Sequence, residues 1–174
     1  SVSGDILIYP DDCVVLDAVF APDRFFAARA REGARYFVGK QVRLIREGLD
    51  VQALTAKGIH FVTPEALLYE DELEDSLGLF DETVQIKTIP SGLSYVGGDA
   101  ELNPELLDRF GTRLYIDGSL TISMENGNLL ENIEILVVTD TIFLPAVWKK
   151  AFGKVSAEFG ELEVVKGKRL RDRG

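Results

Sequence analysis

The feature that most constrains the fold is a motif that recurs about every twenty residues in the second half of the chain. The motif occupies residues 95–102, 115–122, 137–144 and 157–164, so its copies start 20, 22 and 20 positions apart. Each copy ends with two apolar residues that lie two positions apart, a spacing typical of a strand with one buried face. Self-similarity at such a spacing predicts a stack of similar structural units.

A second pattern lies between these strands. Apolar residues follow the spacing i, i+1, i+4 at positions 106, 107 and 110, again at 129, 130 and 133, and again at 147, 148 and 151. This spacing places them on one face of a helix. The first helix has a typical beginning and end, with Asn103 as N-cap, Pro104 in the first turn and Gly111 after the last turn. Each unit is therefore predicted to consist of a strand, a turn, a short helix and a second turn.

These alternating elements predict an α/β fold, a repeat solenoid of parallel strands and short helices with a period of about 20–22 residues. An ordinary α/β sandwich with accidental similarity is the alternative. We expect one domain over residues 1–168, with regular repeats at 93–165, an irregular part at 1–92 and a basic tail at 169–174.

The irregular part contains further segments of the same kind. Residues 37–44 match residues 95–102 in type, and residues 2–8 look like another copy. We expect a helix over residues 64–79, capped by Thr63. The glycines Gly97, Gly98 and Gly118 lie within strands and fit no phosphate-binding motif, so we interpret them as bends or sites of close strand stacking.

The strand at 115–122 and the helix that begins at Pro104 resemble the leucine-rich-repeat-like solenoids of uncharacterised bacterial proteins. The resemblance covers most of residues 93–165 and extends loosely over residues 1–92. The chain lacks the standard Leu-x-x-Leu-x-Leu-x-x-Asn consensus and its recurring asparagine. The resemblance implies a fold and a general habit of binding proteins, and it implies no catalytic residue.

Charge and composition narrow the classes of partner. The net charge of −10 disfavours nucleic acid and anionic membranes and favours a basic partner. The single cysteine, Cys13, can form no internal disulfide, which fits a reducing compartment, and we expect a cytoplasmic location. No apolar run approaches the roughly 18–20 residues of a membrane span. Because the sequence begins at Ser1 rather than Met, we expect residues upstream of it.

The chain offers few residues for catalysis or metal binding. His60 is the only histidine, and no nucleophile is paired with it by sequence. Cys13 follows two aspartates, which disfavour a thiolate, and one His with one Cys cannot form a common zinc site. We interpret the acidic run 70–75 as the solvated face of the helix, whose apolar stripe is Leu67, Leu73 and Leu77. The sequence thus predicts no catalytic residue, no metal and no cofactor.

The strands offer one candidate binding face. If Leu120, Ile142 and their equivalents point inward, the residues beside them point outward and form columns across the sheet. A solvated sheet with scattered aromatics is the alternative, but aromatic residues among carboxylates also suit a protein interface. The candidate binding face comprises Tyr95, Asp99, Glu101, Tyr115, Asp117, Phe143 and Phe159.

We therefore predict a non-enzymatic protein-interaction or scaffolding module. The alternative is a carboxylate-dependent hydrolase acting on a sugar or similar substrate, because Asp99 and Asp117 fall on adjacent strands. A self-assembling structural protein is a third interpretation. Carboxylates at Glu158, Glu161 and Glu163 discourage pairing at the last strand, so a homodimer is expected to form through the N-terminal strand edge at residues 2–8.

Overall fold

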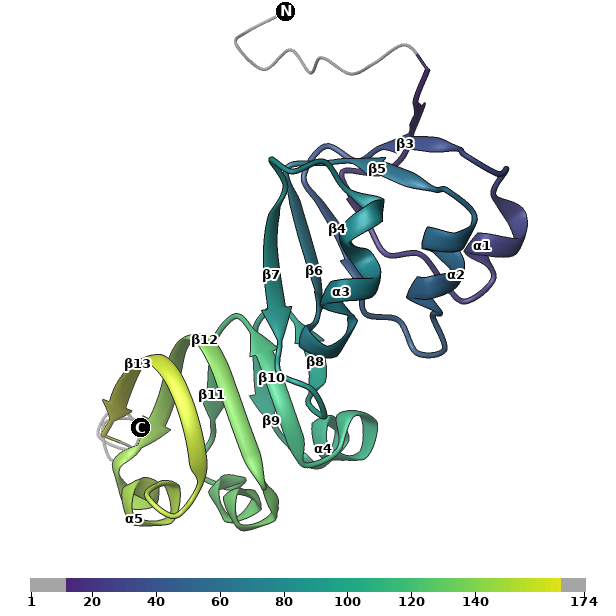
Figure 1. The fold of residues 1–174 in the computed structure, drawn as a ribbon. Helices are drawn as coiled ribbons and strands as arrows, with labels where there is room; N and C mark the ends of the chain where they lie inside the picture. The colour runs from purple at the N-terminus through teal and green to yellow at the C-terminus, as the bar shows by residue number, and fades with distance from the viewer. Residues whose placement is uncertain (1–11, 167–174) are drawn as a thin grey trace, which may run out of the picture. The chain divides into compact units, whose positions relative to one another are not determined.

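The computed structural model describes residues 12–166 and divides the chain into two compact units, residues 1–91 and 92–174. Both units are built from parallel strands connected by short helices and turns (Figure 1). The expected α/β class with parallel strands and short helices is therefore confirmed. The boundary between the units falls beside the expected boundary between the irregular and the regular part, and the single domain over residues 1–168 stays a prediction.

The first unit contains two parallel sheets. One has the order β1-β3-β5 and consists of β1 (Val14–Val15), β3 (Arg35–Phe37) and β5 (His60–Val62). The other has the order β2-β4-β6-β7 and consists of β2 (Val19–Phe20), β4 (Gln41–Leu44), β6 (Glu65–Tyr69) and β7 (Gln85–Ile89). From β1 to β6 the chain alternates between the two sheets, and β7 then follows β6 within the second sheet.

Short helices connect successive strands of this unit. They are α1 (Phe26–Arg29), α2 (Val51–Ala56), the 3-10 turn η1 (Glu70–Glu72), α3 (Leu73–Ser76) and the 3-10 turn η2 (Leu77–Leu79). The Asp50 carboxylate accepts a hydrogen bond from the Ala53 amide at 3.2 Å and caps the start of α2. The Lys57 ammonium donates to the Ala27 carbonyl oxygen at 2.5 Å, which satisfies a carbonyl of α1.

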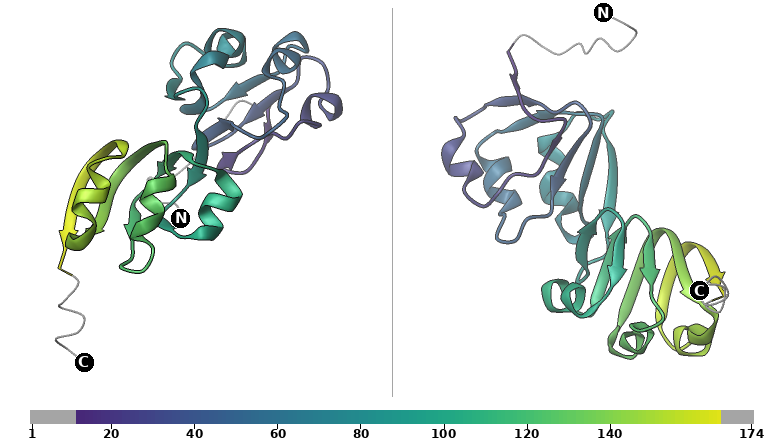
Figure 2. Two further views of the ribbon diagram at one scale, coloured as in Figure 1. Left: turned by 90° about the horizontal axis from the view of Figure 1, so that it is seen from below. Right: turned by 180° about the vertical axis from the view of Figure 1, so that it is seen from behind.

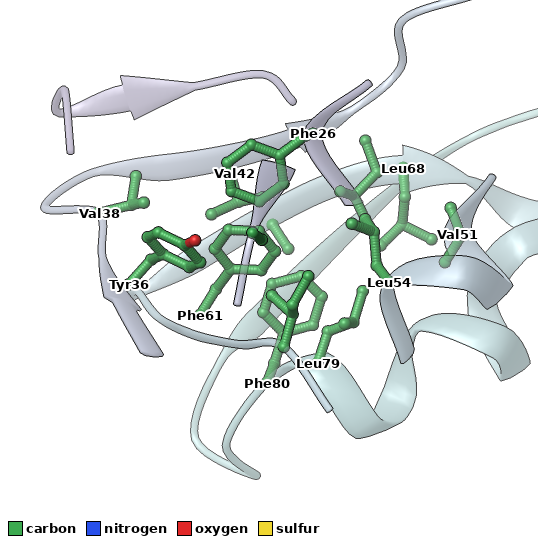
Figure 3. Packing of buried hydrophobic residues seen from close by; sticks show 14 residues of the cluster. Phe26, Tyr36, Val38, Val42, Val51, Leu54, Phe61, Leu68, Leu79 and Phe80 are labelled. Atoms are coloured by element: carbon green, nitrogen blue, oxygen red, sulfur yellow. The ribbon is translucent and has the colours of Figure 1, made fainter. Parts of the chain in front are cut away.

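Aromatic side chains fill the core of the first unit (Figure 3). Phe61 is fully buried, and its ring centroid lies 5.9–6.3 Å from the centroids of Phe20, Phe26, Tyr36 and Phe80. Tilted and offset arrangements of this kind add to the free energy gained from burial. Phe61 therefore joins the strands, α1 and the segment after η2 into one core.

The second unit is built on one six-stranded parallel sheet. Its strands are β8 (Ser94–Gly97), β9 (Ala100–Leu102), β10 (Arg113–Asp117), β11 (Leu120–Ile122), β12 (Ile135–Pro145) and β13 (Ser156–Val165). Strand β12 pairs with β10 through its first half and with β11 through its second half, and β13 follows β12 over both halves. The sheet therefore curls into a half-barrel (Figure 2).

The helices of the second unit are α4 (Pro104–Phe110), the 3-10 turns η3 (Gly127–Asn132) and η4 (Ala146–Trp148), and α5 (Lys149–Phe152). The predicted start of α4 is confirmed, because the Asn103 side chain accepts a hydrogen bond from the Leu106 amide at 2.8 Å and Pro104 is the first helical residue. Gly111 follows the last residue of α4, as expected.

Glycines make the corner of the sheet possible. A Cβ atom on Gly118 would lie 2.7 Å from the backbone carbon of Gly98, and one on Gly160 would lie 2.8 Å from the carbonyl oxygen of Asp140. Gly98 also has φ +88°, a backbone conformation that other residues rarely adopt. The interpretation of Gly98 and Gly118 as sites of bending and close stacking is confirmed.

The register of the second unit agrees with the recurrence in the sequence. Tyr95 pairs with Tyr115, Leu120 pairs with Ala100 and Ile142, and Ile142 pairs with Leu162. Leu120 and Ile142 are fully buried in the core, as expected for inward positions, whereas Thr121 is exposed. Paired residues of the first unit lie 20–25 positions apart, as between Ala66 and Ile86 or between Tyr36 and Phe61.

The expected helix over residues 64–79 is wrong in its first part, because Glu65–Tyr69 is the strand β6 between β4 and β7. Ala66, Leu67 and Leu68 are all buried, and a continuous apolar run of this kind does not distinguish a strand from a helix. The expected apolar stripe is also wrong, since Leu73 and Leu77 are 37% and 58% exposed. The segments expected at residues 2–8 and 169–174 lie outside the described residues.

The register yields a direct test of which side chains face the core. Replacing Leu120 by alanine is expected to lower the free energy of unfolding by about 2–5 kcal/mol, because it leaves a cavity in a packed core. Thr121→Ala, at the neighbouring exposed position, is expected to change it by less than about 0.5 kcal/mol. Urea unfolding followed by circular dichroism measures both, and equal small effects would show that the strand faces the other way.

Candidate binding face

Two tyrosines form the centre of the candidate face. Tyr95 of β8 and Tyr115 of β10 are paired residues on adjacent parallel strands. Their rings are stacked, with centroids 6.2 Å apart and an angle of 23° between the ring planes. Both side chains are half-buried, so one surface of the pair remains accessible. The sequence prediction that these two residues share an outward column is confirmed.

Asp117 holds the tyrosine pair in position. The Tyr95 hydroxyl donates a hydrogen bond of 2.7 Å to Oδ2 of Asp117, and the Thr139 hydroxyl donates to Oδ1 at 3.4 Å. These contacts connect β8, β10 and β12 on the outward side of the sheet. The Tyr95 hydroxyl thus bonds to a carboxylate one strand away, and its ring is fixed by stacking on Tyr115.

The environment of Tyr115 disfavours deprotonation of its hydroxyl. Partial burial of the side chain raises the pKa of Tyr115 above its ordinary value of 10.0, and the nearby negative charge of Asp117 raises it further. Both effects disfavour a negatively charged phenolate beside a carboxylate. The column therefore presents neutral aromatic rings next to an acidic group.

Asp99 has a structural role at the corner of the sheet. Its Oδ1 accepts a hydrogen bond of 2.8 Å from the backbone amide of Ser119, and the Ser119 hydroxyl accepts one of 3.3 Å from the amide of Thr141. Side chains thus bond to backbone amides where the strands bend. Asp99 is exposed, so its remaining oxygen faces solvent.

The second half of the face follows the predicted column. Glu101, Thr121, Phe143 and Glu163 lie side by side through the register of β9, β11, β12 and β13. Phe143 is half-buried, while Glu101, Thr121 and Glu163 are exposed. Glu101 and Phe143 thus lie on the outward side of the second half of the sheet, beyond the glycine corner from the tyrosine pair.

The placement of Phe159 on this face is wrong. Phe159 pairs with Val138, which is 1% exposed and points into the core, and its ring lies 5.8 Å from that of Phe152. The pairing of β12 with β13 shifts by one residue between Val138 and Thr141. A shift of one residue moves a side chain to the opposite face. The regular spacing assumed from sequence paired Phe159 with Thr139 and therefore gave the wrong side.

A hollow adjoins the face at the edge formed by β8 and β9. It has a volume of about 510 Å³, and its polar lining includes Asp99, Glu101, Glu105 and Arg109, beside Tyr95 and Phe110. The guanidinium of Arg109 lies 5.1 Å from the ring centroid of Phe110. Sequence analysis did not include Glu105 and Arg109, although both lie on the helix that follows β9. The sequence signal for these two residues was that both are polar and lie on the helix predicted after Asn103.

Other candidate groups form no comparable site. His60 Nε2 lies 2.9 Å from Oδ1 of Asp81, and in the described part of the chain its side chain forms no hydrogen bond with a serine, threonine or cysteine. Cys13 is half-buried, with its Sγ 4.0 Å from Oδ1 of Asp12. Within residues 12–166, no group of three His, Cys, Asp or Glu side chains is arranged to hold a metal ion. No helix in that range is long and apolar enough to cross a membrane.

Comparisons with known proteins give no relative. No protein-family model matches the chain, and neither the curated proteins nor the solved structures that were searched contain a match. The functional argument therefore depends on the geometry of the face.

The environment of Tyr115 predicts a pH dependence of stability. The folded-state pKa of Tyr115 is raised, so the unfolded chain loses this proton first as the pH rises through 10.0. The free energy of unfolding should then decrease with rising pH, and Tyr115→Phe should reduce the decrease while keeping the stacked ring. Urea unfolding across this pH range measures the effect. Identical pH dependence in both proteins would contradict the assigned environment.

Proposed function

We propose that the chain is a non-enzymatic protein-interaction module whose binding face is the outward side of the sheet in the second unit. The observation that carries the proposal is the group of Tyr95, Tyr115 and Asp117. The two rings are stacked at 6.2 Å, and a hydrogen bond of 2.7 Å holds Tyr95 to Asp117. An aromatic surface that is already ordered loses little conformational entropy when a partner binds.

The proposed body of the module is a solenoid similar to the leucine-rich-repeat-like proteins. Parallel pairing of residues 20–22 positions apart across β8 to β13 supports this interpretation. The wider range of 20–25 positions in the first unit supports a less regular stack of the same kind. Modules of this type present one face of a regular sheet to a partner.

The charge of the face favours a partner with basic side chains. Asp99, Glu101 and Glu163 surround the aromatic residues, and the whole chain has a net charge of −10. An arginine or lysine of the partner can lie over a tyrosine ring while it pairs with a neighbouring carboxylate. Tyrosine residues in such positions are frequent hot spots of protein interfaces.

The same contacts disfavour the alternative of a carboxylate-dependent hydrolase. Asp117 accepts hydrogen bonds from Tyr95 and Thr139, and Asp99 accepts one from the Ser119 amide. These hydrogen bonds give both carboxylates a structural role between adjacent strands. The expected homodimer through residues 2–8 stays a prediction, because those residues lie outside the described part of the chain.

The proposal predicts that the tyrosine pair determines partner binding. Proteins that the wild-type chain captures from a lysate of the source organism should be purified. Their affinity should then be measured for the wild-type chain and for a Tyr95→Ala, Tyr115→Ala double variant. Loss of a hot spot worth about 2 kcal/mol weakens binding roughly thirtyfold. Val147→Ala is the matched control, since Val147 is an exposed apolar residue of the same unit on η4.

Circular dichroism of each variant verifies that its fold is retained. Equal affinity of the partner for the wild-type chain and the double variant would exclude the tyrosine face as the binding site. Hydrolysis of a panel of glycosides that is abolished by both Asp99→Asn and Asp117→Asn would instead favour the hydrolase.

A further inference from the structure

Among residues 12–166, strand β13 lies at the edge of its sheet. In the part of the chain that the structure describes, it pairs with β12 alone, over nearly its whole length. It spans Ser156–Val165, and eight of its ten residues are exposed. The backbone amides and carbonyls on its outer side therefore offer a row of hydrogen-bonding groups, which is the requirement for adding another strand.

The core-facing side chains of β13 are incompletely covered. Phe159, Leu162 and Val164 are 40%, 37% and 39% exposed. Their paired residues in β12, which are Val138, Ile142 and Leu144, are 1%, 0% and 0% exposed. The difference arises because β12 has a strand on both sides and β13 has one neighbour. One additional strand with apolar side chains would bury these three residues as their neighbours are buried.

The other side of β13 is acidic. Glu158, Glu161 and Glu163 pair with outward residues of β12, and all three are exposed, although the strict alternation along β13 is interrupted at Gly160. None of them forms an ion pair with another residue of the described range. Pairing of β13 with β13 of a second copy would bring glutamates close to glutamates, which is unfavourable across adjacent strands. The charge therefore favours a basic partner over a second copy of this chain.

We propose that the outer edge of β13 binds an extended basic segment of a partner protein, which adds to the sheet as a further strand. Beside residues 161–164 the segment has alternating side chains, apolar toward Leu162 and Val164 and lysine or arginine toward Glu161 and Glu163. Backbone hydrogen bonds along the edge supply part of the affinity, and the alternation supplies the specificity. Glu163 also belongs to the outward side of the sheet, but the backbone edge of β13 and the side chains of Leu162 and Val164 are not part of the tyrosine pair, so the inference does not rest on the proposed function.

The test uses synthetic peptides that are long enough to span β13. One peptide alternates valine and lysine, a second alternates valine and glutamate, and a third is the valine–lysine peptide with all of its backbone amides methylated, so that neither of its edges can donate to a strand. Fluorescence anisotropy with the full chain should detect binding of the first peptide, weaker binding at high salt, and at least about tenfold weaker binding of the other two. Hydrogen exchange should show new protection of β13 amides on binding.

Charge reversal provides the matched variant. In the double variant Glu161→Lys, Glu163→Lys, the preference between the valine–lysine and valine–glutamate peptides should be reversed. Both substitutions are at exposed positions, so the fold is expected to be retained, and circular dichroism verifies this. A reversed preference supports strand addition at this edge with charge-determined specificity.

Three results would overturn the proposal. The first is equal binding of the methylated peptide, which would leave charge attraction without strand addition. The second is concentration-dependent protection of β13 without any peptide, which would identify a second copy as the occupant. The third is peptide binding only after Lys168, Arg169 and Arg171 are replaced by serine, which would identify the chain's own basic residues as the occupant.

Discussion

The structure depends on the in-register pairing of parallel strands that come from segments about twenty residues apart. In the second unit, this pairing places equivalent residues side by side, such as Ala100, Leu120 and Ile142 on the inner side. Burial of one such set is favourable, because each large apolar side chain contributes roughly 1.5–3 kcal/mol. The same register then determines what the outer side presents, since the residues between the buried ones must point outward.

The contacts between side chains on the outward side of the sheet are a consequence of this register. Tyr95 and Tyr115 stack because their strands are in register, and Asp117 reaches Tyr95 because it lies two residues after Tyr115 on the same side. The edge at β13 follows from the same pairing. A strand with only one neighbour leaves Leu162 and Val164 partly exposed, whereas Ile142 and Leu144 with two neighbouring strands are buried. Both proposed binding surfaces therefore follow from the same parallel pairing of strands.

The sequence predicted the parts of the fold in which local signals and register agree. The inward positions Leu120 and Ile142 and the helix start at Asn103 were correct, because alternation and capping are local properties. Residues 65–69 were assigned to a helix because Ala66, Leu67 and Leu68 are consecutive apolar residues that fit either structure. Only their position between β4 and β7 makes them a strand, and this depends on residues far away in the chain.

In the candidate site, too, some residues were predictable from the sequence and others were not. Tyr95, Tyr115 and Asp117 were predicted as neighbours from repeat spacing alone, and their hydrogen bond and ring stacking agree with it. Phe159 was assigned to the wrong face because the one-residue shift between Val138 and Thr141 has no signal in the repeat. Arg109 was missed because a helix surface position becomes part of a hollow only when the helix packs beside β8 and β9.

Nuclear magnetic resonance of the full chain tests the central claim, parallel stacking at the repeat spacing, most directly. The account predicts nuclear Overhauser effects between backbone Hα and amide protons of paired residues on β9, β11 and β12, around Leu120 and its partners Ala100 and Ile142. It also predicts the same pattern between β8 and β10 around Tyr95 and Tyr115. Strong Hα–Hα effects between strands that are consecutive in sequence would indicate antiparallel hairpins and would contradict the account.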